Sequence, residues 1–280
     1  MALTADPLWM ITGCSTGLGN ALARTVLARG CRLLATAREP ATLDSLASLG
    51  GNRVRVARLD VAEPNDIVAA VEVARAWGGV DILVNNAGYG YMAALEEGED
   101  TKIRRLFDVN VFGTAALMRA VLPSMRAKAA GAIVNIGSMA GISGGSGSAY
   151  YAASKFALEG LTDSLAGEVG SLGISVMIVE PGPIRTDFAG RSIVVSPELP
   201  AYAQTAGLRR RSVLEANGSQ LGDPNRIAEL IVTALERPLP PRRLVVGKLA
   251  MDVVARKLDE VRAAIESERA ASLATDFDAR

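Results

Sequence analysis

The sequence of 280 residues contains no histidine and only two cysteines, Cys14 and Cys31. These absences exclude most zinc sites, a serine–histidine triad and a disulfide framework. We therefore expect no metal site, and we expect both cysteines to be small packed residues. Any acid–base chemistry has to use tyrosine, lysine, aspartate or glutamate.

The sequence also lacks an excess of charge, because its 30 basic and 30 acidic residues cancel. Nothing in the composition therefore favours nucleic acid or an anionic membrane as a partner. Residues 1–6 lack a basic segment followed by a long apolar run, and apolar stretches elsewhere stop short of membrane-spanning length. We expect a cytoplasmic protein with neither a nucleic-acid nor a membrane partner.

Short, nearly continuous apolar runs rich in β-formers alternate with longer helical patterns. The predicted strands are residues 8–12, 32–37, 53–59, 82–85, 132–136, 175–179 and 244–246, and the predicted helices include 18–28, 65–77, 102–126, 151–169 and 224–236. This alternation predicts an α/β fold, a doubly wound parallel sheet of about seven strands with helices on both faces. Without a repeat or a linker, residues 1–280 should form a single domain.

Two segments depart from this alternation. Residues 186–222 are long, mixed in polarity and poorly periodic, which is consistent with a surface excursion or with a substrate lid. Their position after the sixth predicted strand favours the lid. Residues 252–270 carry apolar side chains at helical spacing with charges between them, so we expect an amphipathic helix packed on this body or on a partner.

A glycine-rich segment from Thr12 to Gly19 lies between the first predicted strand and the first predicted helix. Glycines allow a tight turn and a close approach to a pyrophosphate, whose charge is favoured at a helix N-terminus. In this setting the segment predicts a nucleotide-binding loop. A triphosphate loop would need a lysine after the last glycine, but Asn20 follows Gly19, so ATP and GTP are poor candidates.

About twenty residues beyond the glycines, dinucleotide folds that bind NAD usually carry an acidic residue. Here that place is occupied by Arg38. Together with Ser15 and Thr16 in the glycine loop, its guanidinium could receive the 2′-phosphate of NADP, whereas a solvated arginine beside Glu39 is the competing interpretation. We expect NADP(H) to be preferred over NAD(H).

Tyr151 and Lys155 are four residues apart and therefore share a helix face. A nearby ammonium favours the phenolate and would bring the tyrosine pKa closer to neutrality. Ser138 follows a predicted strand, at the sheet edge where ligands bind, and could polarise a substrate carbonyl. Asn110 lies in an apolar helical segment, which suggests either a water-mediated link to Lys155 or a structural kink.

In combination, these residues resemble the short-chain dehydrogenase/reductase family. The resemblance runs from about residue 8 to 186 and rests on Thr12, Gly13, Gly17, Gly19, Asp60, Val61, Asn85, Asn86, Ala87, Gly88, Asn110, Ser138, Tyr151, Lys155, Pro181 and Gly182. It implies that Ser138 orients the substrate oxygen, Tyr151 transfers the proton, Lys155 lowers the tyrosine pKa and binds the ribose, and Asn110 supports a proton relay.

The resemblance also implies a Rossmann-type sheet and a cofactor site. The implied cofactor-binding residues are Gly13, Ser15, Thr16, Gly17, Leu18, Gly19, Arg38, Asp60, Val61, Asn86, Ala87, Gly88, Tyr151, Lys155, Pro181, Gly182, Ile184 and Thr186. The end of the chain, with a charged helix after its last strand, looks like the subgroup that includes steroid and retinol dehydrogenases. Family members suggest a homodimer or homotetramer with contacts through helices 102–126 and 151–169.

The sequence thus predicts an NADP(H)-dependent enzyme that interconverts a small-molecule alcohol and a carbonyl. Two alternatives remain open, namely a catalytically silent cofactor-binding regulator and an epimerase or dehydratase on the same fold. Arg209, Arg210 and Arg211 in the expected lid could attract an anionic substrate, but such runs more often form a solvated face. The substrate and the physiological direction do not follow from the sequence.

Overall fold

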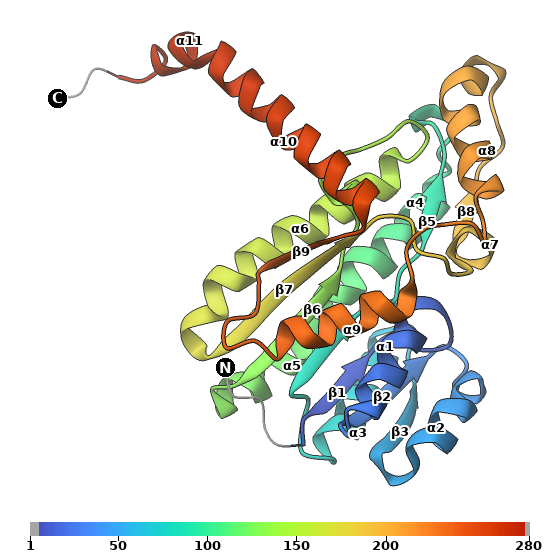
Figure 1. The fold of residues 1–280 in the computed structure, drawn as a ribbon, viewed down its shortest axis with the longest axis vertical. Helices are drawn as coiled ribbons and strands as arrows, with labels where there is room; N and C mark the ends of the chain where they lie inside the picture. The colour runs from blue at the N-terminus through green and yellow to red at the C-terminus, as the bar shows by residue number, and fades with distance from the viewer. Residues whose placement is uncertain (1–5, 278–280) are drawn as a thin grey trace.

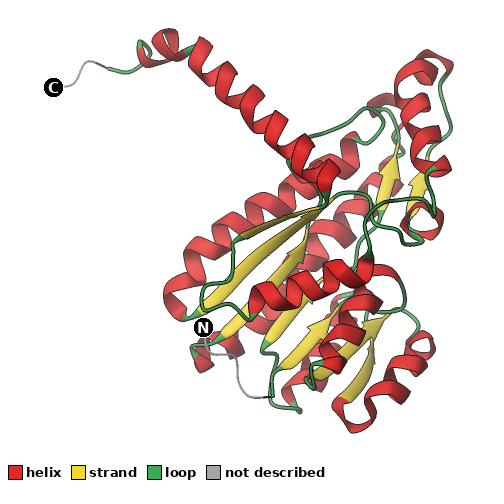
Figure 2. Ribbon diagram, in the orientation of Figure 1, coloured by secondary structure: helices red, strands yellow, loops and turns green. Residues whose placement is uncertain are grey.

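The computed structural model describes residues 6–277. Of the N-terminal segment 1–6 considered above, only Asp6 lies within this range. Seven parallel strands form one sheet in the order β3-β2-β1-β4-β6-β7-β9 (Figures 1 and 2). They are β1 Leu8–Ile11, β2 Arg32–Ala37, β3 Val54–Arg58, β4 Ile82–Asn85, β6 Gly131–Ile136, β7 Ile174–Pro181 and β9 Arg243–Val246. The predicted seven-stranded parallel sheet is confirmed.

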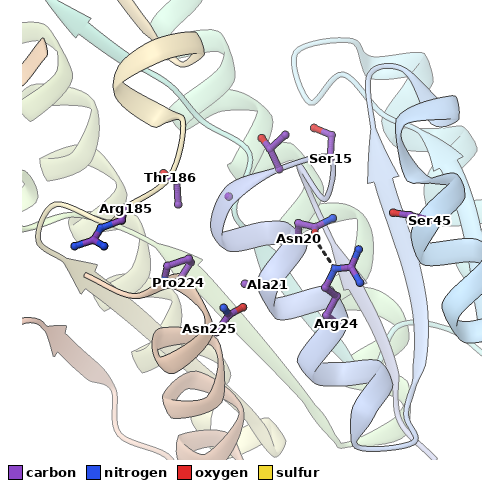
Figure 3. Close-up of a pocket in the computed structure, with 11 residues that line it drawn as sticks. Ser15, Asn20, Ala21, Arg24, Ser45, Arg185, Thr186, Pro224 and Asn225 are labelled. Carbon is purple, nitrogen blue, oxygen red and sulfur yellow. Dashed lines mark hydrogen bonds between the residues drawn. The ribbon is translucent and has the colours of Figure 1, made fainter. Parts of the chain in front are cut away.

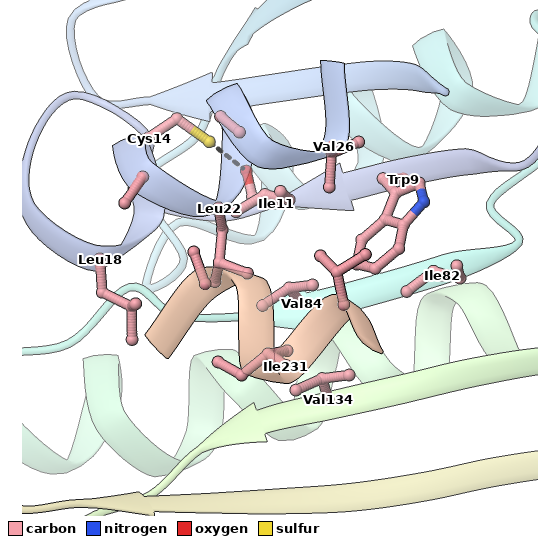
Figure 4. Close-up of a cluster of buried hydrophobic side chains, with 14 of the residues drawn as sticks. Trp9, Ile11, Cys14, Leu18, Leu22, Val26, Ile82, Val84, Val134 and Ile231 are labelled. Carbon is pink, nitrogen blue, oxygen red and sulfur yellow. Dashed lines mark hydrogen bonds between the residues drawn. The ribbon is translucent and has the colours of Figure 1, made fainter. Parts of the chain in front are cut away.

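Both faces of the sheet are buried, which explains why its strands read as continuous apolar runs. Trp9 and Ile11 of β1 point into one hydrophobic cluster, whereas Leu8 and Met10 point into a second cluster on the opposite face. Successive side chains of a strand alternate between faces, so every position of β1 has to be apolar. Figure 4 shows the first cluster, in which Ile231 of a helix packs over the sheet.

Helices cover each face. The first cluster is closed by α1 Gly17–Ala28, α2 Asp44–Gly50 and α9 Pro224–Leu235, and the second by α3 Pro64–Arg75, α5 Thr114–Lys128 and α6 Ala149–Val169. Each predicted helix is present, and α2 was not predicted. A doubly wound sheet of one domain follows from this layering.

The strand order reverses between β1 and β4. β1 is followed by β2 and then β3 on one side, and the chain then returns to place β4 and β6 on the other side. Ligands of open α/β sheets bind outside the carboxyl ends of the strands at such a switch point. The segments after β1, β4 and β6 carry the predicted glycine loop, the Asn86–Gly88 stretch and Ser138, so this topology brings them to one edge.

A continuous helical stretch runs through α4 Asp100–Phe107, the π-helical turn η4 Asp108–Gly113 and α5. Asp100–Lys128 has the length and the mean hydropathy, 1.3, of a membrane-crossing helix, although apolar stretches were expected to fall short of this length. Leu117, Val121 and Met125 are buried in the second cluster against the sheet. This packing against the sheet accounts for the apolar character of the stretch Asp100–Lys128.

The expected lid, residues 186–222, is folded. It contains α7 Phe188–Arg191, β8 Ile193–Val195 and α8 Leu208–Glu215. β8 pairs in parallel with β5 Gly90–Met92, forming a small second sheet that the sequence did not predict. Strands of three residues whose partners are about a hundred positions apart leave almost no pattern in the sequence.

The last helices, α10 Lys248–Ser267 and α11 Arg269–Leu273, extend away from the body (Figure 1). Ala250 and Val254 in the first two turns are buried, whereas Leu258 and Ile265 are 53% and 61% exposed. The predicted amphipathic helix is present, and only its first turns pack on this body.

Candidate functional site

The glycine loop has the backbone that close ligand approach requires. Gly13 and Gly17 have φ angles of +72° and +59°, which L side chains rarely adopt. A Cβ on Gly19 would lie 2.3 Å from the carbonyl oxygen of Gly13, so only glycine fits at the start of α1. The loop therefore presents bare backbone at a helix N-terminus, which suits a pyrophosphate.

The predicted cofactor residue Asn86 holds this loop from the neighbouring strand. Its side-chain amide donates hydrogen bonds of 2.8 and 3.2 Å to the carbonyl oxygens of Thr12 and Gly13. In the other direction, the backbone N–H groups of Asn86 and Ala87 donate to the hydroxyl of Thr12 at 2.9 and 2.8 Å. The loops after β1 and β4 thus form one rigid unit, whose geometry would depend little on the cofactor.

A cavity of about 480 Å³ opens beside the glycine loop (Figure 3). It is lined by Ser15, Thr16, Gly17, Asn20, Ala21, Arg24, Ser45, Arg185, Thr186, Pro224 and Asn225. Four predicted cofactor residues, from the glycine loop and the segment after β7, therefore border one space. Arg24 and Arg185 add positive charge to it, and the sequence analysis did not single out either.

Arg38 directly follows β2 and is exposed, without a side-chain partner among the described interactions. Arg58, its neighbour at the end of β3, donates a hydrogen bond of 3.2 Å to the backbone carbonyl of Arg38. Arg58 is also paired with Asp66 at 3.2 Å, so Arg38 is the arginine at this corner that could hold an anion without giving up a charged partner among the described residues. Arg58 lies within the predicted strand 53–59, but only the observed pairing of β2 with β3 places it beside Arg38.

Asp60 and Val61 occupy the adjacent strand end. The Asp60 carboxylate accepts from the backbone N–H of Ala62 at 3.0 Å and pairs with Arg105 at 2.6 Å. Val61 is buried, and its carbonyl oxygen would lie 2.3 Å from a Cβ on Gly113. The close packing of the helix at Gly113 fixes these two residues at the sheet edge.

The segment after β7 returns to the glycine loop. Gly182 donates a hydrogen bond of 2.9 Å to Val246, which holds the segment beside β9. Ile184 forms an isolated bridge with Gly222, and Thr186 lies 3.4 Å from the place of a Cβ on Gly17. Pro181, Gly182, Ile184 and Thr186 are therefore placed along one path from the sheet to the loop.

The predicted catalytic side chains meet at the carboxyl end of β6. Tyr151 lies in the first turn of α6, and the Ser138 hydroxyl is close enough to its phenol to affect the pKa of that group. The Lys155 ammonium lies 5.9 Å from the centre of the Tyr151 ring and donates a hydrogen bond of 2.8 Å to the carbonyl of Ile136. Three of the four predicted catalytic residues are thus brought together.

Burial dominates the electrostatics of this group. It raises the pKa of Tyr151, an effect that the nearby Ser138 hydroxyl partly offsets. Burial also lowers the pKa of Lys155 to about 8, against the opposing attraction of Glu159. The expected lowering of the tyrosine pKa is therefore not found, because burial outweighs the effect of Ser138.

Asn110 is buried in the π-helical turn, with its side chain fully used. Its carbonyl accepts from the backbone N–H of Tyr89 at 3.1 Å, and its amide donates to Tyr89 and to Ser154 at 3.0 and 3.1 Å. A Cβ on Gly88 would lie 3.0 Å from the Asn110 carbonyl and 3.8 Å from the Lys155 ammonium. Asn110 thus lies near the lysine, and the structural kink that sequence left open is also present.

The structure contradicts both interpretations of the arginine run for its central member. Arg210 is 5% exposed and forms an ion pair with Glu97, whose side chain is fully buried. The neighbouring Arg211 pairs with Glu198 at 3.4 Å on the surface. A run of charges gives no sign of which member turns inward, so the sequence could not reveal this pair.

The chain is also similar in sequence to known proteins. Residues 8–193 match the family described as short chain dehydrogenase. An oxidoreductase of Botryotinia fuckeliana, BOA17, is 36% identical over 96% of this chain and 98% of its own length. Retinol dehydrogenase 8 of Bos taurus is 36% identical over 84% of this chain and 79% of its own.

Solved structures share the fold. A short-chain dehydrogenase from Streptomyces avermitilis is 40% identical and superposes with a TM-score of 0.92 over 98% of this chain and all of that one. A family member from Burkholderia phymatum, described as a complex with NAD, is 25% identical with a TM-score of 0.83 and covers 94% of this chain and 97% of its own. A metagenomic member, described as a complex with NADP, is 27% identical with a TM-score of 0.68 and covers 86% of this chain and 96% of its own. The chain belongs to the short-chain dehydrogenase family and is an oxidoreductase of that type.

Proposed function

We propose that this protein is an NADP(H)-dependent oxidoreductase that interconverts a secondary alcohol and a carbonyl compound, with Tyr151 as general acid and base. The observation that carries the proposal is the phenol of Tyr151, which lies beside Ser138 at the carboxyl edge of the sheet, with the Lys155 ammonium 5.9 Å from the centre of its ring. A bound nicotinamide would supply or accept the hydride. Solved family members that hold NAD or NADP support a nicotinamide cofactor.

The residues divide the proton chemistry between them. In reduction, the carbonyl carbon accepts a hydride while the oxygen takes a proton from Tyr151. Because burial raises the pKa of Tyr151, the phenol is protonated at neutral pH and ready to donate. In oxidation the phenolate is needed, and the charged form of Lys155 would stabilise it. Ser138 would orient the substrate oxygen, and Asn110 would support a proton relay beside Lys155.

The preference for NADP rests on charge. Arg38 stands free at the end of β2, with Arg58 beside it, where an acidic residue would mark an NAD site. Ser15 and Thr16 line the cavity at the glycine loop and would add hydroxyl donors. The Arg38 guanidinium would give the 2′-phosphate a charge-assisted contact, whereas the guanidinium of Arg58 is already paired with Asp66 at 3.2 Å.

The test is a fluorescence titration of the purified protein with NADPH and with NADH. Wild type should bind NADPH more tightly, and Arg38→Ala should reduce that preference by about tenfold, the loss of one charge-assisted contact of about 1.4 kcal/mol. Arg24→Ala is the comparison variant, because it removes the same charge from α1, at the lining of the cavity, to which Arg38 does not belong. A preference for NADH in wild type would refute the assignment.

Turnover is tested separately with a carbonyl panel and NADPH. Tyr151→Phe, which removes one oxygen atom, should reduce the rate by about a hundredfold or more, because general acid catalysis contributes at least that much. Binding of NADPH without any turnover in wild type would favour a regulator. Product formation without net NADPH consumption would favour an epimerase or dehydratase.

We also propose a cytoplasmic homodimer or homotetramer acting on a small molecule. Phe112 and Phe156, on the two helices expected to form the contact, are 62% and 47% exposed, which is unusual for large aromatic side chains. Light scattering after size-exclusion chromatography should give a mass above that of one chain. Phe156→Glu should reduce it if α6 carries the interface.

A further inference from the structure

A buried carboxylate lies directly behind the proposed catalytic pair. Tyr151, Lys155 and Glu159 follow one another at four-residue spacing on α6 and therefore share one side of the helix. Glu159 is 6% exposed, a position in which an acidic side chain is normally paired. The sequence analysis overlooked it, although the spacing that identified Lys155 also identifies Glu159.

Only one of the two Glu159 oxygens has a charged partner among the described residues. Its Oε2 lies 2.9 Å from a guanidinium nitrogen of Arg243 in β9, but both carboxylate oxygens are buried without a hydrogen-bond partner among the described residues. Arg243 is shared, because it also pairs with the fully buried Glu180 of β7 and lies 3.7 Å from Asp163 of α6. A single guanidinium thus serves three carboxylates, so its attraction for Glu159 is divided.

The element on the other side brings no ionisable group. The turn η5, Met139–Gly141, packs so closely that a Cβ on Gly141 would lie 3.0 Å from Oε1 of Glu159. Lys248 at the start of α10 is exposed and pairs with Asp252. The charges facing Glu159 are therefore Lys155, Arg243, Glu180 and Asp163, and Lys155 is the buried cation on its own helix.

We propose that Glu159 is a positioning residue whose carboxylate keeps the buried ammonium of Lys155 charged beside Tyr151. This inference rests on the proposed function, in which a charged Lys155 stabilises the phenolate. Without the carboxylate, burial would drive Lys155 toward its neutral form. Burial raises the pKa of Glu159 to about 7 in spite of the opposing attraction of Arg243, so the carboxylate is ionised above neutral pH, where Lys155 begins to lose its proton.

The test measures the titration of Lys155 itself and does not need a substrate. The chain contains five lysines, so protein labelled with ¹³Cε-lysine gives five signals, and the signal absent from Lys155→Met belongs to Lys155. Attraction between i and i+4 side chains at an effective dielectric constant of about 20, weakened by Arg243, predicts a shift on the order of one pH unit. In wild type the signal should titrate near pH 8.

Glu159→Gln should lower the titration midpoint of Lys155 on the order of one pH unit. Glu159→Asp retains the negative charge, so its Lys155 midpoint should lie close to that of wild type. Asp163→Asn is the matched control, because Asp163 also faces Arg243 but its side chain is 71% exposed. The Lys155 midpoint in this variant should equal that of wild type. If Glu159→Gln does not fold, Glu159→Met provides a neutral replacement of similar volume, since apolar substitutes for buried charges are often tolerated.

An unshifted Lys155 in the neutral variants, or an equal shift in Asp163→Asn, would overturn the inference. The proposed function fails separately, if Tyr151→Phe retains full carbonyl turnover. Loss of turnover in Tyr151→Phe together with an unshifted Lys155 would therefore reject the role of Glu159 and keep the enzyme assignment.

Discussion

The ion pair between Glu97 and Arg210 should hold the segment 186–222 onto the body of the protein. Glu97 belongs to the short turn η3, Leu95–Glu97, and Arg210 to α8. The Glu97 carboxylate also accepts backbone N–H groups of Ala94 and Leu199 at 2.7 and 2.9 Å. One buried carboxylate therefore joins the body to two points of this segment.

The loss of stability expected in Glu97→Gln depends on which contacts Arg210 keeps. Removing one member of a buried pair usually costs about 3 to 5 kcal/mol, because the other charge stays buried and uncompensated. In Glu97→Gln, Arg210 keeps a hydrogen bond of 3.2 Å to the carbonyl of Ser196 and a second carboxylate, Glu198, at 3.7 Å. We therefore expect the lower end of that range, about 3 kcal/mol.

Two assays separate a local from a global effect. Urea unfolding followed by circular dichroism measures the loss of overall stability. Limited trypsin digestion measures opening of the segment, because Arg209 and Arg211 flank the buried Arg210. A loss of about 3 kcal/mol in the opening equilibrium corresponds to cleavage about a hundredfold faster. Glu198→Gln, at the partly exposed rim, should change either measurement by less than about 1 kcal/mol.

Equal unfolding midpoints and equal cleavage rates for Glu97→Gln and wild type would refute this reasoning. Faster cleavage with an unchanged midpoint would locate the effect in the segment alone. Both outcomes are distinguishable without knowledge of the substrate.

Three further predictions concern other parts of the protein. Despite the opposing effect of burial, the pKa of Glu97 is lowered by the Leu199 and Ala94 N–H groups and by Arg210. The contribution of Glu97 to stability should therefore be present above about pH 4.3 and be lost as the pH falls through the pKa of the folded state. Urea midpoints from pH 6 to 3 should show this loss in wild type but not in Glu97→Gln. Gly19→Ala should weaken NADPH binding about tenfold or more in the fluorescence titration, because its Cβ meets backbone. Burial raises the pKa of the Cys14 thiol to about 12, so mass spectrometry after N-ethylmaleimide treatment at pH 8 should find Cys31 modified before Cys14.

The sheet was predictable because burial on both faces leaves a plain trace in each strand. Leu8, Trp9, Met10 and Ile11 are all apolar for this reason, and the run identifies β1 without any knowledge of its neighbours. The glycine loop and the Tyr151–Lys155 pair were predictable because local spacing carries the geometry. The strands, the loop and the order of the elements therefore followed from short-range pattern.

Features set by distant contacts could not be predicted in the same way. The pairing of β5 with β8 and the burial of Arg210 both depend on the fold of residues 186–222, whose sequence has no clear period. The state of Tyr151 also depends on burial, which raises its pKa where spacing to Lys155 suggested the opposite. Such effects are properties of the packed environment and have no local signature.

Tyr151 and Lys155 belong to one helix, and Ser138 follows the strand on which that helix packs. None of the proposed catalytic groups comes from residues 186–222. Substitutions can therefore change this outer segment without moving Ser138, Tyr151 or Lys155, provided that the ion pair between Glu97 and Arg210 remains. β6 and α6, which position these three proposed catalytic groups, are thus separate from the segment for which a substrate lid was predicted, so this segment can be altered while those groups stay in place.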